Sequence, residues 1–264
     1  MQGFDAKAGL WPRLQNALFQ ILMMKTNLHQ LCGKIEGLTR SRRSRDFVMS
    51  QIGGGLGPAA VSASLAGMGG AAISIATLDT TETADYVEFV LDGKPLRGWF
   101  WKFPFSDGDE VEVVAEPSET GPWSALGVRR ESDGLVAVYP HCFEGRWSHY
   151  FSTFRVWGGI MGFTFIVILI FDLIQAVNRG NFSWSGQASA YAGYFGYMLP
   201  GLLGVSVFFT WLAGRKTEGF ARFAEVVFRG FGWNNPSKLN LRAISKRKRK
   251  PGDGRDYGLR YFRY

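Results

Sequence analysis

The side chains best suited to chemistry in this sequence are the neighbours His141 and Cys142. A histidine and a thiol are the residue types of a nucleophile and its general base. If both lie on one strand, however, they point to opposite faces and cannot act on each other. A distant partner such as His29 or His149 would have to complete such a site. The simpler interpretation is a buried thiol at the end of a strand.

Carboxylates and glycines supply the other candidates for chemistry. Five acidic residues lie between Asp107 and Glu116, but their spacing is not that of an EF-hand, and a solvated turn and strand face explain them. The glycine-rich run Gly53–Pro58 is not followed by Lys-Ser or Lys-Thr, so it does not match a phosphate-binding loop. The chain has no HExxH, CxxC or GxSxG motif. The sequence therefore predicts a non-enzymatic protein with no catalytic residues, metal site or cofactor.

Two long apolar runs, 156–177 and 191–214, are the strongest structural signal. Each is long enough to cross a bilayer as a helix, and neither contains Lys or Arg. Many basic residues follow the second run, whereas the connection 178–190 carries only Arg179. Because Lys and Arg stay in the cytoplasm during insertion, we expect a two-span hairpin with an outside loop and both termini in the cytoplasm.

One carboxylate, Asp172, interrupts the first run. An acid inside hydrocarbon is costly and is by default functional, but Asp172 is close to the outer end and could instead reach the interface. Both runs also contain several glycines, among them Gly158, Gly162, Gly196 and Gly204. Such small residues permit tight packing within the hairpin or self-association of the protein.

Residues 33–148 have the short strands and tight turns of an antiparallel β-domain. Asp-Gly pairs end at Gly93, Gly108 and Gly134, where hairpin turns require positive φ. The predicted strands are Lys34–Leu38, Asp46–Ser50, Tyr86–Leu91, Pro95–Phe105, Val111–Val114, Trp123–Arg129 and Leu135–Tyr139. The basic stretch Thr39–Arg45 is predicted to be the turn of a first hairpin. The predicted fold class is an α+β membrane protein, in which a small antiparallel OB-like β-barrel domain precedes a two-helix transmembrane hairpin.

Three further segments complete the expected organisation. Residues 1–32 have the spacing of an amphipathic helix, which would lie on a membrane or pack on the β-domain. A charge-free insertion, 52–78, consists mostly of Gly, Ala and Ser, and its candidate functional residues are Gly53, Gly57, Gly67 and Gly70. This insertion either packs on the barrel or enters the membrane, and the flanking charge argues against a stable third span. Residues 215–264 are expected to form a basic cytoplasmic tail.

The formal net charge of +8 is concentrated at residues 40–45 and after residue 215. Beside a membrane span, this pattern indicates topology and contact with anionic lipid headgroups. Nucleic acid is not an expected partner, because no nucleic-acid-binding motif accompanies the charge. The two cysteines, Cys32 and Cys142, are too few for a disulfide-built scaffold and are expected to be reduced.

The order of several motifs resembles a family of bacterial membrane proteins described as type VI secretion system effectors. The motifs are Gly33-Lys-Ile-Glu-Gly-Leu, Val90-Leu-Asp-Gly-Lys-Pro-Leu-Arg-Gly-Trp-Phe-Trp, Gly108-Asp-Glu-Val-Glu-Val-Val, and Tyr139-Pro-His-Cys-Phe-Glu-Gly-Arg146 directly before the two spans. The resemblance covers roughly residues 30–215. It implies an inner-membrane location and a role in interbacterial competition, and it carries no catalytic residues.

These observations lead to two expected functions. The first is an inner-membrane protein of a type VI secretion effector locus that acts as a non-enzymatic, membrane-acting effector. The alternative is an adaptor or immunity-type module whose β-domain holds a partner at the cytoplasmic membrane face. The partner would be an effector or immunity protein from the same locus.

Overall fold

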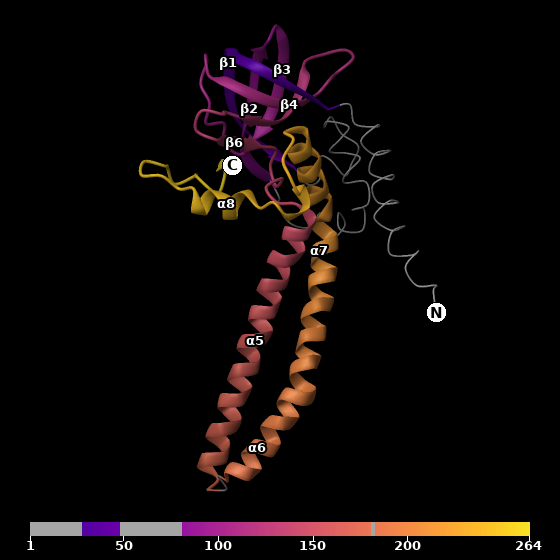
Figure 1. Ribbon diagram of the computed structural model, residues 1–264, viewed down its shortest axis with the longest axis vertical. Coiled ribbons are helices and arrows are strands. Elements are labelled where there is room, and N and C mark those ends of the chain that lie inside the picture. The colour runs from indigo at the N-terminus through magenta and orange to yellow at the C-terminus, as the bar shows by residue number, and fades with distance from the viewer. Residues whose placement is uncertain (1–27, 48–80, 181–182) are drawn as a thin grey trace, which may run out of the picture. The chain divides into compact units, whose positions relative to one another are not determined.

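The computed structural model describes residues 28–47, 81–180 and 183–264 (Figure 1). The chain forms two compact units. One comprises the described residues up to Gly145 together with Gly219–Tyr264, and the other is built from the described residues of Arg146–Glu218. The predicted helix 1–32 lies outside the described residues except at its end. The insertion 52–78, with Gly53, Gly57, Gly67 and Gly70, lies entirely outside them.

The first unit is built on a closed five-stranded β-barrel. Its strands are β1 (His29–Asp46), β2 (Thr81–Leu91), β3 (Lys94–Phe100), β4 (Glu110–Glu116) and β5 (Trp123–Arg129). β1 pairs with both β2 and β4, β2 with β3, and β4 with β5, all antiparallel. A parallel pairing of β3 with β5 closes the barrel. This five-stranded closure agrees with the predicted OB-like barrel.

Strand β1 differs most from the sequence-based expectation. The predicted hairpin at Thr39–Arg45 is wrong, because this stretch continues β1 and pairs residue by residue with β2. The helix predicted up to residue 32 is also wrong at its end, since β1 begins at His29. Gly37 has φ 63°, and the register of β1 against β2 shifts between Glu36 and Thr39. The resulting β-bulge bends β1, so that its first half pairs with β4 and its second half with β2.

The Asp-Gly turns are confirmed. Gly93, Gly108 and Gly134 have φ of 71°, 84° and 69°, and Asp92 also has positive φ, 51°. Asp92 and Gly93, two adjacent residues with positive φ between β2 and β3, form a type I′ turn, whose twist matches that of the flanking strands. β3 ends at Phe100, so the predicted strand Pro95–Phe105 is too long. The side chains of Phe103 and Phe105 nevertheless fill the barrel core.

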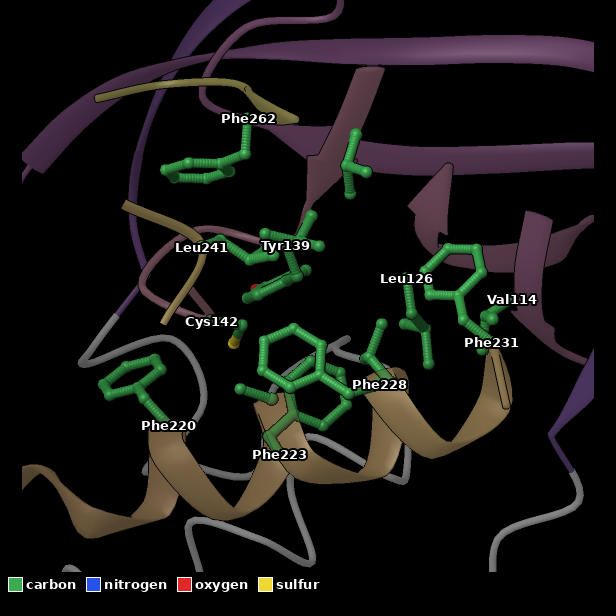
Figure 2. Packing of buried hydrophobic residues seen from close by; sticks show 14 of the residues in the cluster. Val114, Leu126, Tyr139, Cys142, Phe220, Phe223, Phe228, Phe231, Leu241 and Phe262 are labelled. Carbon is green, nitrogen blue, oxygen red and sulfur yellow. The ribbon is translucent and has the colours of Figure 1, made fainter. Parts of the chain in front are cut away.

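A second apolar core lies outside the barrel, where the end of helix α7 (Leu199–Gly230) packs on the sheet. Figure 2 shows phenylalanines of α7 pointing toward Tyr139, Leu126 and Val114. The sheet continues from β5 to β6 (Leu135–Val138) and β7 (Phe262–Arg263). Between α7 and β7 lie η3 (Pro236–Lys238) and α8 (Leu241–Arg247).

This core corrects the predicted tail at 215–264. From Gly219 onward, the segment belongs to the same compact unit as the barrel, and it contributes a helix face and a strand to that unit. This segment packs on the barrel unit because it carries apolar residues at helical spacing, which are stabilised when another apolar surface covers them. Its members are Phe220, Phe223, Ala224, Val227, Phe228 and Phe231.

The second unit contains α5 (Arg146–Asn178), α6 (Trp184–Gly193), the π-helical turn η2 (Tyr194–Met198) and the first part of α7. Two helices, Arg146–Asn178 and Trp184–Arg215, are long and apolar enough to cross a membrane. They contain the predicted runs 156–177 and 191–214. Large apolar side chains such as Phe163 and Ile170 are exposed along them. The helix pair therefore presents to its surroundings the kind of surface that lipid covers.

Candidate functional site

His141 lies in a tight turn after β6 and not on a strand. The amide of Cys142 donates to the carbonyl of Tyr139 over 3.1 Å, and His141 has φ 68°. A non-glycine residue in this left-handed region is uncommon and marks a locally constrained backbone. The turn places His141 Nε2 3.3 Å from Oε2 of Glu82, a residue 59 positions earlier in the chain (141 − 82).

The carboxylate of Glu82 connects His141 to an aromatic cluster. Trp101 Nε1 donates to the same Oε2 of Glu82 over 2.8 Å. The ring of His141 contacts Trp101 at 5.0 Å and Phe220 at 5.1 Å between centroids. The hydrogen bond from His141 is the main reason that the pKa of Glu82 is lowered, and the bond from Trp101 adds to it against the opposing effect of burial. Glu82 is therefore an anion that two donors hold in place.

Cys142 is the opposite case. Its side chain is fully buried in the core of Figure 2, and the thiol donates to the carbonyl of Pro140 over 3.4 Å. Burial raises the pKa of this thiol well above its ordinary value. Only a thiolate is a good nucleophile, so this environment makes Cys142 unreactive. The side chains of His141 and Cys142 thus lie in different surroundings, as predicted. The two residues lie in a turn, however, and not on a strand.

Two of the acidic residues at 107–116, Asp109 and Glu112, pair with arginines of the barrel unit. Glu112 accepts from Arg129 at 3.3 Å, and Asp109 lies 2.6 Å from Arg130. Arg130 also pairs with Asp133 at 2.8 Å. Among residues 28–47, 81–180 and 183–264, no group of three or more His, Cys, Asp or Glu side chains is arranged to hold a metal ion.

Asp172 lies in α5, in the other unit. Its carboxylate receives a hydrogen bond from the hydroxyl of Tyr194, the first residue of η2. This bond connects the start of η2 to α5 and gives the acid a local partner. Asp172 belongs to a different unit from His141 and Cys142, so the three residues do not form one site.

A set of arginines and aromatic rings on the outer side of β1–β3 was not identified from the sequence. The guanidinium of Arg43 lies 4.6 Å from the ring centroid of Tyr86, and that of Arg45 lies 5.1 Å from the ring of Trp99. Tyr86 and Trp99 are cross-strand partners with their rings 4.9 Å apart. With the exposed Arg97, these four residues form what we call the arginine–aromatic face.

The signal for this face was present in the sequence. Arg43 and Arg45 stand two residues apart, which places both on one side of a strand. Treating Thr39–Arg45 as a turn hid this alternation. A guanidinium over an aromatic ring is a favourable pair, and the planar guanidinium stacks well on such rings.

No protein family, no curated protein and no solved structure matches this chain. The chemistry of the site therefore rests on its own geometry. The described residues combine a fixed carboxylate, an unreactive buried thiol and a basic aromatic surface, which is an arrangement suited to binding.

Proposed function

We propose that the protein is a two-span inner-membrane protein of a type VI secretion effector locus whose barrel binds a partner without catalysing a reaction. The arginine–aromatic face is the observation that carries this proposal. Arginine and large aromatic side chains are enriched at the energetic centres of protein interfaces. Here Arg43, Arg45, Tyr86, Trp99 and Arg97 occupy one face of a rigid barrel.

The charge of this face indicates the kind of partner. Its three arginines outnumber one neighbouring carboxylate, Glu88, which accepts a hydrogen bond from Tyr86 at 3.0 Å. The net positive charge favours an acidic protein segment, because opposite charge steers association and favours the correct partner. An effector or immunity protein from the same locus is the partner that the family resemblance implies. The apolar helices of the second unit would anchor the barrel in the membrane, with the anionic headgroups attracting nearby basic residues.

The proposal predicts that a charge-removing double variant, Arg43→Gln with Arg97→Gln, loses partner binding by at least about tenfold. Both side chains are exposed, so the barrel should remain folded. The measurement is co-purification of the neighbouring gene products with the detergent-solubilised full chain. Arg249→Gln with Arg255→Gln is the matched control, since it removes two exposed arginines elsewhere. Equal recovery with both double variants would contradict the proposal.

A second candidate function is the non-enzymatic, membrane-acting effector, and the glycines of the helix pair favour it. A Cβ added at Gly159, Gly162, Gly201 or Gly204 would meet nothing within 4 Å. Close helix approach between copies of the chain could use these open positions. Expression of the chain alone distinguishes the two functions. Growth arrest or loss of membrane potential would support the effector, whereas unaffected growth together with partner recovery supports the binding module.

A further inference from the structure

A pocket of about 360 Å³ lies beside Glu82. It is lined by Glu82 and Thr83 of β2, Trp101, Arg242 of α8, Leu259 and Arg260. Its volume is in the range of sites that hold small molecules. All six residues belong to the barrel unit.

Arg242 is the most informative residue of this pocket. Its guanidinium carbon lies 3.7 Å from the ring centroid of Phe143 and 6.0 Å from that of Trp101. Within the described part of the chain, no hydrogen bond or close ion pair of its side chain is seen. Burial lowers the pKa of Arg242, and the charge of Glu144 nearby opposes that shift. The arginines Arg130 and Arg263, by contrast, are both held by aspartates. Arg242 is exposed, and its contact with the ring of Phe143 orients the guanidinium while leaving donors available for an anion.

Arg260 brings a second guanidinium to the same pocket. It lies 3.5 Å from Asp256, whose other carboxylate oxygen is bound more closely by Lys102 at 2.6 Å. The pairing of Arg260 is therefore long and shared, and its side chain is exposed. Guanidinium groups suit a phosphoryl group, because each can donate two parallel hydrogen bonds to its oxygens.

Glu82 gives the pocket a negative side. Its Oε2 is occupied by Trp101 and His141, while Oε1 has no hydrogen-bond partner among the described residues. A free carboxylate oxygen beside two arginines disfavours a purely anionic ligand and favours one that also carries a positive charge. The indole of Trp101 adds an aromatic wall that suits an ammonium group.

We propose that this pocket binds a zwitterionic phosphate ester, with the phosphoryl group on Arg242 and Arg260 and the ammonium group at Glu82. Phosphoethanolamine is the simplest molecule with this chemistry. It occurs free in solution and as the headgroup of a phospholipid. Binding of the free compound to detergent-solubilised protein does not depend on the proposed partner or on membrane insertion.

The test is isothermal titration of the solubilised full chain with phosphoethanolamine and with ethyl phosphate, which lacks the ammonium group. We expect phosphoethanolamine to bind about tenfold more tightly than ethyl phosphate, as one charge-assisted hydrogen bond would give. Arg242→Gln should weaken both ligands at least about tenfold, and Glu82→Gln should abolish the difference between them. Arg249→Gln is the matched control, because it removes an equal charge outside the pocket.

Three results would overturn the proposal. They are no binding of phosphoethanolamine at millimolar concentration, equal affinity of the wild type for both ligands, and an Arg242→Gln variant that binds as the control does. Thermal melting of each variant verifies that it is folded, and Arg260→Gln provides a second loss-of-binding variant. The same titration in nanodiscs distinguishes the two sources of the ligand. If the natural ligand is a lipid headgroup, nanodiscs of phosphatidylethanolamine should abolish binding of free phosphoethanolamine, and nanodiscs of phosphatidylglycerol should not. If the natural ligand is soluble, free phosphoethanolamine should bind in both kinds of nanodisc.

Discussion

Two cysteines in different surroundings give the simplest test at the scale of single residues. Cys142 is fully buried with a raised pKa, whereas Cys32 is exposed on β1. Partial burial and the charges of Glu112 and Glu131 raise the pKa of Cys32, so its thiolate fraction is small. We expect a maleimide to label one thiol per folded chain slowly and a second thiol only after denaturation. Mass spectrometry of the labelled peptides identifies the two residues.

Fast labelling of Cys142 in the folded protein would contradict this account of the core. The variant Cys32→Ser is the control, because it should leave no reactive thiol until the protein unfolds.

The lowered pKa of Glu82 predicts that the stability of the folded protein depends on pH. Its pKa is lower in the folded protein than in the unfolded chain, mainly because His141 hydrogen-bonds to the charged form. A lowered folded pKa contributes stability that is complete above the unfolded value, about 4.3, and is lost as the pH falls through the folded value. The difference in melting temperature between wild type and Glu82→Gln should therefore be constant from pH 7 to about 5 and then shrink in acid.

The side chain of Glu82 is 40% exposed, so solvent screening keeps this contribution modest. Glu119→Gln is a suitable control, because Glu119 is exposed in a loop. A wild-type advantage that grows as the pH falls below 4 would contradict the assigned pairing.

At the scale of elements, the contact of α7 with the barrel depends on two glycines. A Cβ on Gly127 of β5 would lie 2.8 Å from Val227 and Phe231, and one on Gly230 would lie 2.6 Å from Val114. Such overpacking typically costs about 1–3 kcal/mol. We expect Gly127→Ala to lower the midpoint of thermal unfolding by several degrees. Gly121→Ala is the control, since its Cβ would meet only an ordinary contact at 3.7 Å from Ser118.

An unchanged melting midpoint in Gly127→Ala would mean that the helix does not pack as described. A decrease in Gly121→Ala of equal size would point to a general effect of adding a methyl group to a loop or strand.

Sequence patterns predicted the elements whose apolar and polar residues alternate simply. Strand Trp123–Arg129 and the three Asp-Gly turns are where they were expected. Thr39–Arg45 was missed because arginines are not typical of strands, whereas Arg43 and Arg45 here lie over aromatic rings. The stripe from Phe220 to Phe231 has helical spacing and could have been recognised. Its interspersed charges, such as Arg222 and Arg229, made it resemble a tail.

The candidate site was less accessible to sequence reasoning for a physical reason. His141 was singled out, but its partner Glu82 and the neighbouring Arg242 come from segments far apart in the chain. Only the closure of the barrel and the return of the C-terminal segment bring them together. No spacing rule connects such residues, because tertiary packing sets their distances.

At the scale of the whole molecule, a barrel unit and a pair of apolar helices belong to one chain. Helix α7 is the element that belongs to both units, with Leu199–Glu218 in one and Gly219–Gly230 in the other. If the helices cross a membrane, the positive-inside rule places the barrel in the cytoplasm together with the basic residues that follow Gly214. The connection between the helices is then on the outside.

Accessibility of two cysteines in spheroplasts tests this topology most directly. The native Cys32 reports on the barrel, and Ser185→Cys reports on the exposed start of α6 in the predicted outside loop. A membrane-impermeant maleimide should label Ser185→Cys in intact spheroplasts and should label Cys32 only after lysis. Labelling of Cys32 before lysis, or of Ser185→Cys only after lysis, would contradict a cytoplasmic barrel anchored by two spans.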